Sequence, residues 1–329
     1  MENLLKVEGL KTHFFTEAGI VKAVDGISFT IKKGESLGLV GESGSGKTVT
    51  ALSILGLVPQ PGKIVEGSIY FEGENLLTKS KDEMRSIRGK KISIIFQDPT
   101  SSLNPLLTIE TQIKDIMQAH LDIDKSEIDE QIINLLEIVG LPDPETRMRE
   151  YPHMFSGGMK QRVAIARALA LGPSLLFADE PTTNLDVTIQ AQVLDLLNDI
   201  KNKIGMSLVM ITHDMGIIAK MTTRVVVLYA GQICEIAPTT VLFEDPYHPY
   251  TIALLEAVPR LDVRKELKLI PGNIPNLITP PTGCRFHPRC EYKVDECAND
   301  IPILEKVGDE HYVACSMRAR IRAEMGMGN

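Results

Sequence analysis

The feature that most constrains this chain is a glycine-rich segment, Gly41–Thr48, with the sequence Gly-Glu-Ser-Gly-Ser-Gly-Lys-Thr. It lies between a short apolar run, Ser36–Val40, and a helical pattern over residues 47–57. Glycines let backbone N–H groups close around phosphate oxygens, and the following helix adds a favourable dipole. The segment therefore predicts a nucleotide phosphate-binding loop, in which Lys47 reaches the β- and γ-phosphates and the Thr48 hydroxyl binds Mg²⁺. The predicted contacts are Gly41, Ser43, Gly44, Ser45, Gly46, Lys47 and Thr48.

Apolar runs typical of buried strands alternate with helical patterns along the chain. Strands are predicted at 92–96, 175–178, 207–211 and 224–229, and helices at 106–140, 156–171 and 187–204. This alternation predicts an α/β fold with a largely parallel sheet.

Two carboxylates end one of these predicted strands. Asp179 and Glu180 follow the run Leu175–Ala178, at the edge of the sheet where a phosphate loop would also lie. Asp179 suits Mg²⁺ binding through water, and Glu180 suits polarisation of the water that attacks the γ-phosphate. A second predicted anion site is Ser156-Gly157-Gly158, where a serine and exposed N–H groups begin a helix.

Composition excludes several classes of protein. The 329 residues include 35 basic and 43 acidic side chains, and this net charge of −8 argues against a nucleic-acid binder. The hydrophobic fraction of 43% is that of a globular protein. The sequence shows neither a signal peptide nor an apolar run long enough to span a membrane. We therefore predict an intracellular protein with reduced thiols.

The last part of the chain is rich in proline and cysteine. Nine of the 19 prolines lie between Pro238 and Pro288, which predicts an extended, turn-rich segment. Four cysteines follow the pattern Cys284-x5-Cys290-x6-Cys297-x17-Cys315, which suits a tetrahedral metal ion or a cubane cluster. We predict that the fifth, Cys234, is a small buried residue.

The order of these motifs resembles the ABC ATPases over about residues 4–240. Several further residues match that family by position: Gln97 the Q-loop glutamine, Asn184-Leu185-Asp186 the D-loop, and His213 the switch histidine. Phe14 matches the aromatic that stacks on adenine, with Phe15 as a competitor. Phe155 and Met159 depart from the outer positions of the usual signature, Leu-Ser-Gly-Gly-Gln.

The resemblance implies a P-loop NTPase with a mixed sheet, an antiparallel β subdomain and a helical subdomain at about 98–165. It implies an ABC nucleotide-binding domain at 1–240 and a C-terminal extension at 241–329. ATP would be sandwiched between two such domains, with Ser156, Gly157 and Gly158 acting on the partner's nucleotide. Glu180 would be the general base, His213 would contact the γ-phosphate, Gln97 would join Asp179 and Thr48 at Mg²⁺, and Asp186 would lie at the dimer contact.

Three segments resemble the ATPases of dipeptide and oligopeptide importers: Gln97–Pro105, His248–Leu255 and the cysteine tail. This implies an ATP-hydrolysing subunit at the cytoplasmic face of a membrane. Its partners would be two permease subunits, a related second ATPase or a second copy, and indirectly a solute-binding protein. The alternatives are an importer of nickel or another small solute and a non-transport regulatory ATPase. The segment Gly283–Cys290 resembles a motif associated with a 4Fe-4S cluster, which ranks above zinc, with disulfides last.

Overall fold

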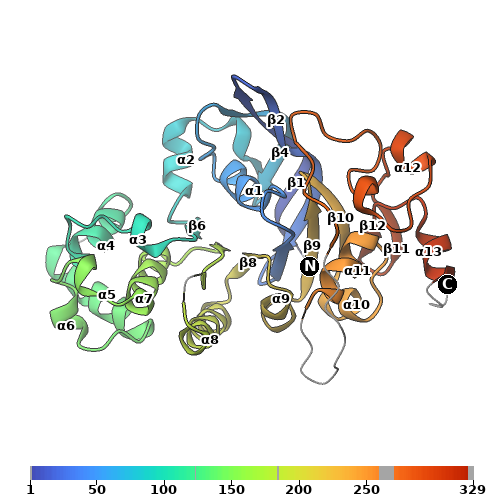
Figure 1. Ribbon diagram of the computed structural model, residues 1–329. Coiled ribbons are helices and arrows are strands. Elements are labelled where there is room, and N and C mark those ends of the chain that lie inside the picture. The colour runs from blue at the N-terminus through green and yellow to red at the C-terminus, as the bar shows by residue number, and fades with distance from the viewer. Residues whose placement is uncertain (1, 123, 184, 259–269, 325–329) are drawn as a thin grey trace. The chain divides into compact units, whose positions relative to one another are not determined.

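The computed structural model describes residues 2–122, 124–183, 185–258 and 270–324 (Figure 1). It divides into two compact units, which are described separately. The first comprises residues 1–32, 36–78 and 211–329, and the second comprises residues 33–35 and 79–210. Among the described residues, no helix has both the length and the apolar character needed to cross a membrane.

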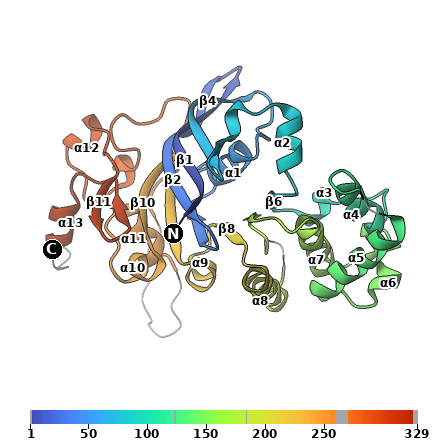
Figure 2. The ribbon, with the colours of Figure 1, turned by 180° about the vertical axis from the view of Figure 1, so that it is seen from behind.

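An antiparallel sheet forms the first layer of the first unit. Its strands lie in the order β2 (Gly19–Lys32), β1 (Asn3–Thr16), β4 (Gly62–Phe71) and β5 (Glu74–Asn75). Alternate side chains of β1, such as Leu5 and Val7, are buried, and α1 (Lys47–Ile54) lies beside β1 and β2 (Figure 2). A short 3-10 turn, η1 (Leu76–Thr78), follows β5.

A second sheet in this unit supports the predicted phosphate loop. β3 (Ser36–Val40) pairs in parallel with β9 (Arg224–Tyr229), which pairs antiparallel with β10 (Gln232–Pro238). β12 (His311–Val313) adds to β10, and β11 (Glu305–Gly308) adds to β12. β3 and β9 are buried on both faces, which is why they read as continuous apolar runs.

Short helices complete the first unit. α9 (Met215–Met221) precedes β9, and α10 (Thr239–Glu244) and α11 (Pro249–Glu256) follow β10. The cysteine region contains the 3-10 turn η3 (His287–Arg289), α12 (Glu296–Asn299) and α13 (Arg318–Glu324). The prediction of an extended, turn-rich segment between Pro238 and Pro288 was thus incomplete, because α10 and α11 lie within it. Farther along the chain, β11 and β12 extend the sheet that contains β10.

The second unit combines two parallel strands with helices. β6 (Ile92–Ile95) pairs with β7 (Leu175–Asp179), and β8 (Ser207–Thr212) runs across the boundary at residue 210. Its helices are α2 (Lys81–Ile87), α3 (Pro99–Ser102), α4 (Ile109–Gln118), α5 (Lys125–Ile138), α6 (Pro144–Arg147), α7 (Gly157–Leu169) and α8 (Val187–Ile204), with the 3-10 turn η2 (Pro152–Met154). Helices α3 to α7 gather in one group (Figure 1).

The strands and helices predicted between residues 36 and 229 agree with the structure to within a few residues. The exception is the single helical span at 106–140, which is two helices, α4 and α5. Helix α7 begins after the predicted cap, Ser156, and α8 ends at Gly205 in the left-handed conformation.

Candidate active site

The phosphate loop connects β3 to α1 in the first unit. A Cβ atom at Gly41 would lie 2.1 Å from the Leu228 carbonyl oxygen, a backbone atom that cannot move aside easily. Gly231 N–H donates to the Ser45 carbonyl at 2.9 Å, and Ser45 N–H donates to the Glu42 carbonyl at 3.2 Å. The loop therefore packs directly on the turn between β9 and β10.

Lys47 lies at the centre of this loop. Its ammonium group donates to the carbonyl oxygens of Gly41 at 2.7 Å and Glu42 at 3.0 Å, and its side chain is buried. The Ser45 hydroxyl is buried without a hydrogen-bond partner in the described part of the chain, and a phosphate oxygen would satisfy it. Ser43, Gly44 and Thr48 are exposed. The loop thus presents polar groups around one ammonium, as phosphate binding requires.

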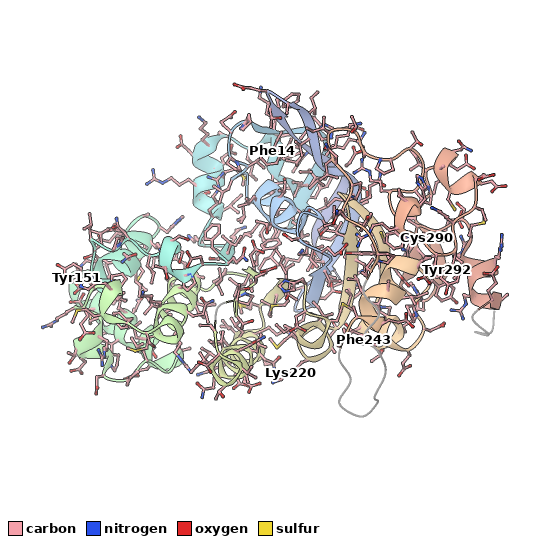
Figure 3. The ribbon with its side chains drawn as sticks, in the orientation of Figure 1. Phe14, Tyr151, Lys220, Phe243, Cys290 and Tyr292 are labelled. Carbon is pink, nitrogen blue, oxygen red and sulfur yellow. The ribbon has the colours of Figure 1, made fainter. Side chains whose placement is uncertain are left out.

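Two further predicted residues lie in the first unit. His213 is exposed between β8 and α9, next to Asp214, whose carboxylate caps α9 by accepting from Gly216 N–H at 2.7 Å. Phe14 lies on β1 (Figure 3) and is half-buried, with its ring edge against Gly62, whereas Phe15 is exposed. The role of Phe14 in adenine stacking stays a prediction.

The carboxylate pair lies in the second unit, where β7 ends. Asp179 is 3% exposed, and Glu180 follows it with a φ of 44°, a strained value for a residue with a side chain. Gln97 donates to one Glu180 carboxylate oxygen at 2.8 Å, and the Thr183 hydroxyl donates to the same oxygen at 3.0 Å. The structure therefore brings Gln97 and Glu180 together at adjacent strand ends, and two donors fix the carboxylate.

The Ser-Gly-Gly motif begins α7 in the same unit. Ser156 is exposed, and its hydroxyl accepts from Met159 N–H at 3.3 Å. A Cβ atom at Gly158 would lie 2.8 Å from the Ile189 side chain. Asp186 caps α8 by accepting from Ile189 N–H at 2.9 Å. Ile189 therefore contacts both the signature, through its side chain at Gly158, and the D-loop residue Asp186, through its backbone. Asn184 lies outside the described residues.

The departure from the usual signature at Phe155 has a packing explanation. This ring is 5% exposed and lies 6.0 Å from the Arg147 guanidinium, so an aromatic side chain fills a buried position before the helix cap.

These motifs together define an ATPase of the ABC class. Residues 24–183 match the ABC transporter family, and residues 234–297 match the C-terminal region of the oligopeptide/dipeptide transporter family. The chain belongs to the ABC transporter family, among the ATP-binding proteins of the oligopeptide/dipeptide type.

Individual relatives span nearly the whole chain. The chain is 48% identical over 313 residues to the oligopeptide transport ATP-binding protein OppD of Bacillus subtilis, covering 94% of this chain and 87% of the relative. It is 45% identical over 313 residues to the dipeptide transport ATP-binding protein DppD of Escherichia coli, covering 95% and 96%. These similarities favour the peptide-importer prediction over the two alternatives.

Solved structures support the fold. The ATP-binding cassette MJ0796, solved as a dimer bound to ADP and Pi, matches with a TM-score of 0.65 at 28% identity, covering 71% of this chain and 98% of that one. CbiO1 from Clostridium perfringens, part of an ABC transporter complex, matches with a TM-score of 0.63 at 26% identity, covering 74% and 92%.

The four tail cysteines are free thiols of intermediate exposure, and Cys234 is buried as predicted. Neighbouring backbone N–H groups, of Phe286 and His287 at Cys284 and of Tyr292 at Cys290, lower the thiol pKa and so oppose the effect of burial. Burial raises the pKa of Cys290 to about 11 and that of Cys315 to about 12, and neighbouring thiols add to both shifts.

The described part of the chain nevertheless contains no preassembled site for one metal ion. Within the described ranges, no group of three or more His, Cys, Asp or Glu side chains converges closely enough to hold a metal ion. The prediction of a cluster therefore rests on the four cysteines of the sequence, and the positions of their sulfur atoms provide no support for it.

The sequence analysis missed two residues that contact the phosphate loop. Arg289 forms an ion pair with Glu42 at 2.7 Å, and the Tyr250 hydroxyl accepts from Glu42 N–H at 2.8 Å. Arg289 lies within the segment that suggested a cluster, and Tyr250 within a segment that suggested a peptide importer. No local pattern marks a contact between residues more than 200 positions apart.

Proposed function

We propose that this chain hydrolyses ATP to power the uptake of di- and oligopeptides as the ATP-binding subunit of a membrane ABC transporter. The observation that carries the proposal is the Glu180 carboxylate at the end of β7, fixed by Gln97 and Thr183 at 2.8 and 3.0 Å. The peptide substrate is proposed from the OppD and DppD relatives.

Each residue of the proposed site has a chemical role. Lys47 and the loop N–H groups bind the β- and γ-phosphates, and Phe14 stacks on adenine. Glu180 accepts a proton from the attacking water, while His213 orients that water against the γ-phosphate. Thr48, Asp179 and Gln97 are the proposed Mg²⁺ ligands, with Asp179 acting through water; the bound ion would neutralise charge on the phosphate oxygens.

The signature residues Ser156, Gly157 and Gly158, of which the first two are exposed, are proposed to act on the nucleotide of a partner ATPase, with Asp186 at the dimer contact. The partner is a second copy or a related subunit, and two permease subunits hold the pair at the membrane. This assembly makes the chain a peripheral membrane protein that meets peptides only through the permease and its solute-binding protein.

A Glu180→Gln variant tests the catalytic part. The amide keeps the size of the side chain but cannot accept the proton, so turnover should fall by roughly 10²–10⁴-fold with MgATP affinity retained. Glu145→Gln on α6 is the matched control, because that carboxylate is exposed on a helix of the same unit. Hydrolysis is measured with the assembled transporter in vesicles, together with uptake of labelled dipeptide. Unimpaired hydrolysis in Glu180→Gln would refute the assignment of Glu180, and hydrolysis that peptide does not stimulate would refute the substrate.

We also propose that Cys284, Cys290, Cys297 and Cys315 hold a 4Fe-4S cluster in the extension at 241–329. The support is the set of four cysteines within residues 284–315, each a free thiol of intermediate exposure. When bound, the group would cross-link a proline-rich segment. Protein purified without oxygen should be brown and absorb near about 400 nm. A colourless protein with one zinc per chain would exclude the cluster.

A further inference from the structure

Arg289 is a buried cation that joins three segments of the first unit. Its side chain is 6% exposed, and its two terminal nitrogens donate to the two Glu42 carboxylate oxygens at 2.7 and 3.1 Å. The Nε–H group donates to the Pro271 carbonyl at 2.7 Å, and the terminal nitrogens also donate to the Tyr229 hydroxyl at 3.3 Å and the Ile270 carbonyl at 3.4 Å. Such a bidentate pair fixes both partners in direction as well as in distance.

Aromatic rings enclose this guanidinium. Its carbon lies 5.7 Å from the Tyr229 ring centroid and 6.0 Å from that of Phe286. The Tyr229 and Tyr250 rings are 4.6 Å apart, and both residues are at most 1% exposed. Because burial excludes water, the ion pair with Glu42 is screened less than a surface pair would be.

Tyr250 contacts the backbone of Glu42, the loop residue whose side chain Arg289 binds. Its hydroxyl accepts from Glu42 N–H at 2.8 Å, so the C-terminal region contacts both the main chain and the side chain of Glu42. His248 in turn accepts from Tyr250 N–H at 3.0 Å and begins α11. The backbone of Tyr250 is therefore fixed at the start of α11, and its hydroxyl reaches Glu42 from there.

The negative charge of Glu42 is electrostatically unfavourable beside a site for a polyanion. Its carboxylate is half-buried within the loop that would receive the β- and γ-phosphates. An unpaired carboxylate there would repel the triphosphate, and the repulsion would be stronger than in water because the surroundings are partly buried. Arg289 neutralises this charge and keeps it directed toward the C-terminal region.

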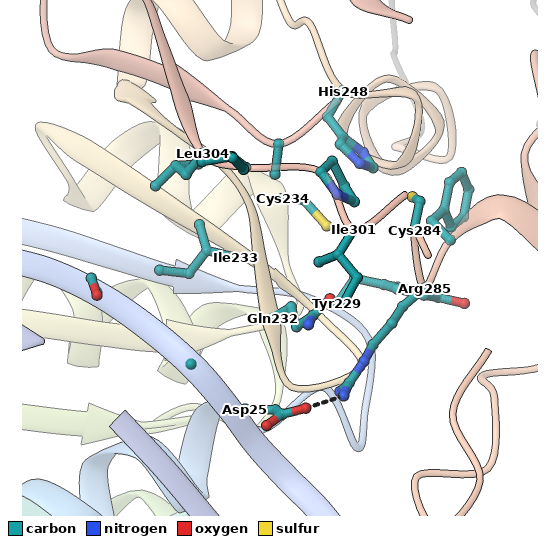
Figure 4. A pocket seen from close by; sticks show the side chains of 16 residues that line it. Asp25, Tyr229, Gln232, Ile233, Cys234, His248, Cys284, Arg285, Ile301 and Leu304 are labelled. Atoms are coloured by element: carbon teal, nitrogen blue, oxygen red, sulfur yellow. Dashed lines mark hydrogen bonds and ion pairs between the residues drawn. The ribbon is translucent and has the colours of Figure 1, made fainter. Parts of the chain in front are cut away.

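A second arginine, Arg285, joins the same part of the tail to β2 and to the turn after β9. Arg285 forms an ion pair with Asp25 on β2 and donates to the Ala230 carbonyl, and it lines a cavity of about 390 Å³ with Cys234 and Cys284 (Figure 4). Cys284 and Cys290 flank the segment that contains both arginines. The cysteine motif and the contact with the phosphate loop are therefore one structural element.

We propose that Arg289 is a positioning residue for nucleotide binding, through which the C-terminal cysteine motif sets the affinity of the phosphate loop for MgATP. The inference rests on the proposed function, because it takes the loop to be the ATP site. It adds that the C-terminal region, beyond the ABC core, acts on ATP affinity through Glu42.

The test compares variants in the non-hydrolysing Glu180→Gln background, by titration calorimetry with MgATP. Arg289→Gln should raise the Kd about tenfold, because it leaves the Glu42 carboxylate unpaired beside the phosphates. Arg289→Lys keeps the charge but not the bidentate geometry, so its Kd should lie between that of the parent and that of Arg289→Gln. With Glu180 intact, Arg289→Gln should raise KM and leave kcat nearly unchanged.

The double variant Glu42→Gln/Arg289→Gln separates positioning from folding. Removing the carboxylate removes the repulsion, so its Kd should return to within about threefold of the parent value. Arg322→Gln is the matched control, since Arg322 is another buried arginine of this region, paired with Asp245 at the end of α10 at 2.6 Å. The control should bind MgATP with the parent affinity.

An unchanged Kd in Arg289→Gln would overturn the inference. So would a loss of affinity that Glu42→Gln does not rescue, because that result would make Arg289 a general folding residue. A parent protein that binds no MgATP, or binds it equally well after Lys47→Ala, would instead contradict the proposed function.

Discussion

The two motifs proposed to contact phosphate, the loop at 41–48 and the signature at 156–158, are supported in different ways. The loop touches buried groups from distant segments, among them the Leu228 carbonyl, Tyr250 and Arg289. The signature is exposed at Ser156 and Gly157, and its support is local, from its own helix and from Ile189 on α8.

This difference indicates different tasks. A loop that must surround a polyphosphate benefits from being held in one conformation before binding, because the ordering cost is then already met. A motif that acts on another molecule must be exposed, and a helix start provides N–H groups without burial. The comparison predicts that substitutions in the loop damage the fold, whereas substitutions in the signature damage only the assembled enzyme.

Gly41→Ala should break the loop most severely. The new Cβ atom would lie 2.1 Å from the Leu228 carbonyl oxygen and 2.7 Å from the Ser45 hydroxyl, so backbone must move. We expect the free energy of unfolding to fall by about 4 kcal/mol and MgATP binding to be lost. Chemical denaturation and calorimetry measure the two effects. A variant of parental stability would show that the loop is not rigidly supported.

The second-largest expected effect is a loss of stability at acid pH, which arises at His248 beneath the phosphate loop. Burial lowers the pKa of His248 from 6.5 to about 4, although Glu235 opposes the shift. The unfolded chain therefore binds more protons between these pH values, and stability falls as the pH drops from about 6.5 to about 4. The contribution is about 3 kcal/mol at most.

Because His248 supports Tyr250, the protection factors of amides in the phosphate loop, corrected for the intrinsic exchange rate at each pH, should fall in this pH range before those in α7. His248→Asn keeps an acceptor at the helix start but removes the titration. Its stability should depend less on pH over the same interval, and an unchanged pH profile would exclude His248 as the cause.

Sequence patterns predicted the local parts of both motifs but not their surroundings. Strand, loop and helix around Lys47 follow from an apolar run, glycines and a helical period, all within about 20 residues. The ranges of β1, β2 and β4 were not predicted, because register shifts near Gly9 and Lys11 interrupt their alternation. The Arg289–Glu42 pair spans 247 positions and depends on tertiary packing alone.

Gly158→Ala should have a smaller effect than Gly41→Ala. Its Cβ atom would meet the Ile189 side chain at 2.8 Å, and a side chain can rotate where a carbonyl cannot. Alanine also favours the helix, so the free energy of unfolding should change by about 1 kcal/mol or less. The assembled transporter should nevertheless hydrolyse ATP more slowly. A loss of stability comparable to that of Gly41→Ala would remove the contrast between the two motifs.

Ser156→Ala should have the smallest effect on folding. The hydroxyl is exposed and its hydrogen bond to Met159 N–H is long, at 3.3 Å, so losing the cap should cost about 0.5 kcal/mol. If Ser156 contacts the partner's nucleotide, turnover in the assembled transporter should fall far more than stability does. Thr108→Ala, which removes the helix cap of α4 in the same unit, is the matched control and should leave turnover unchanged. Equal losses of turnover in the two variants would mean that Ser156 only caps a helix.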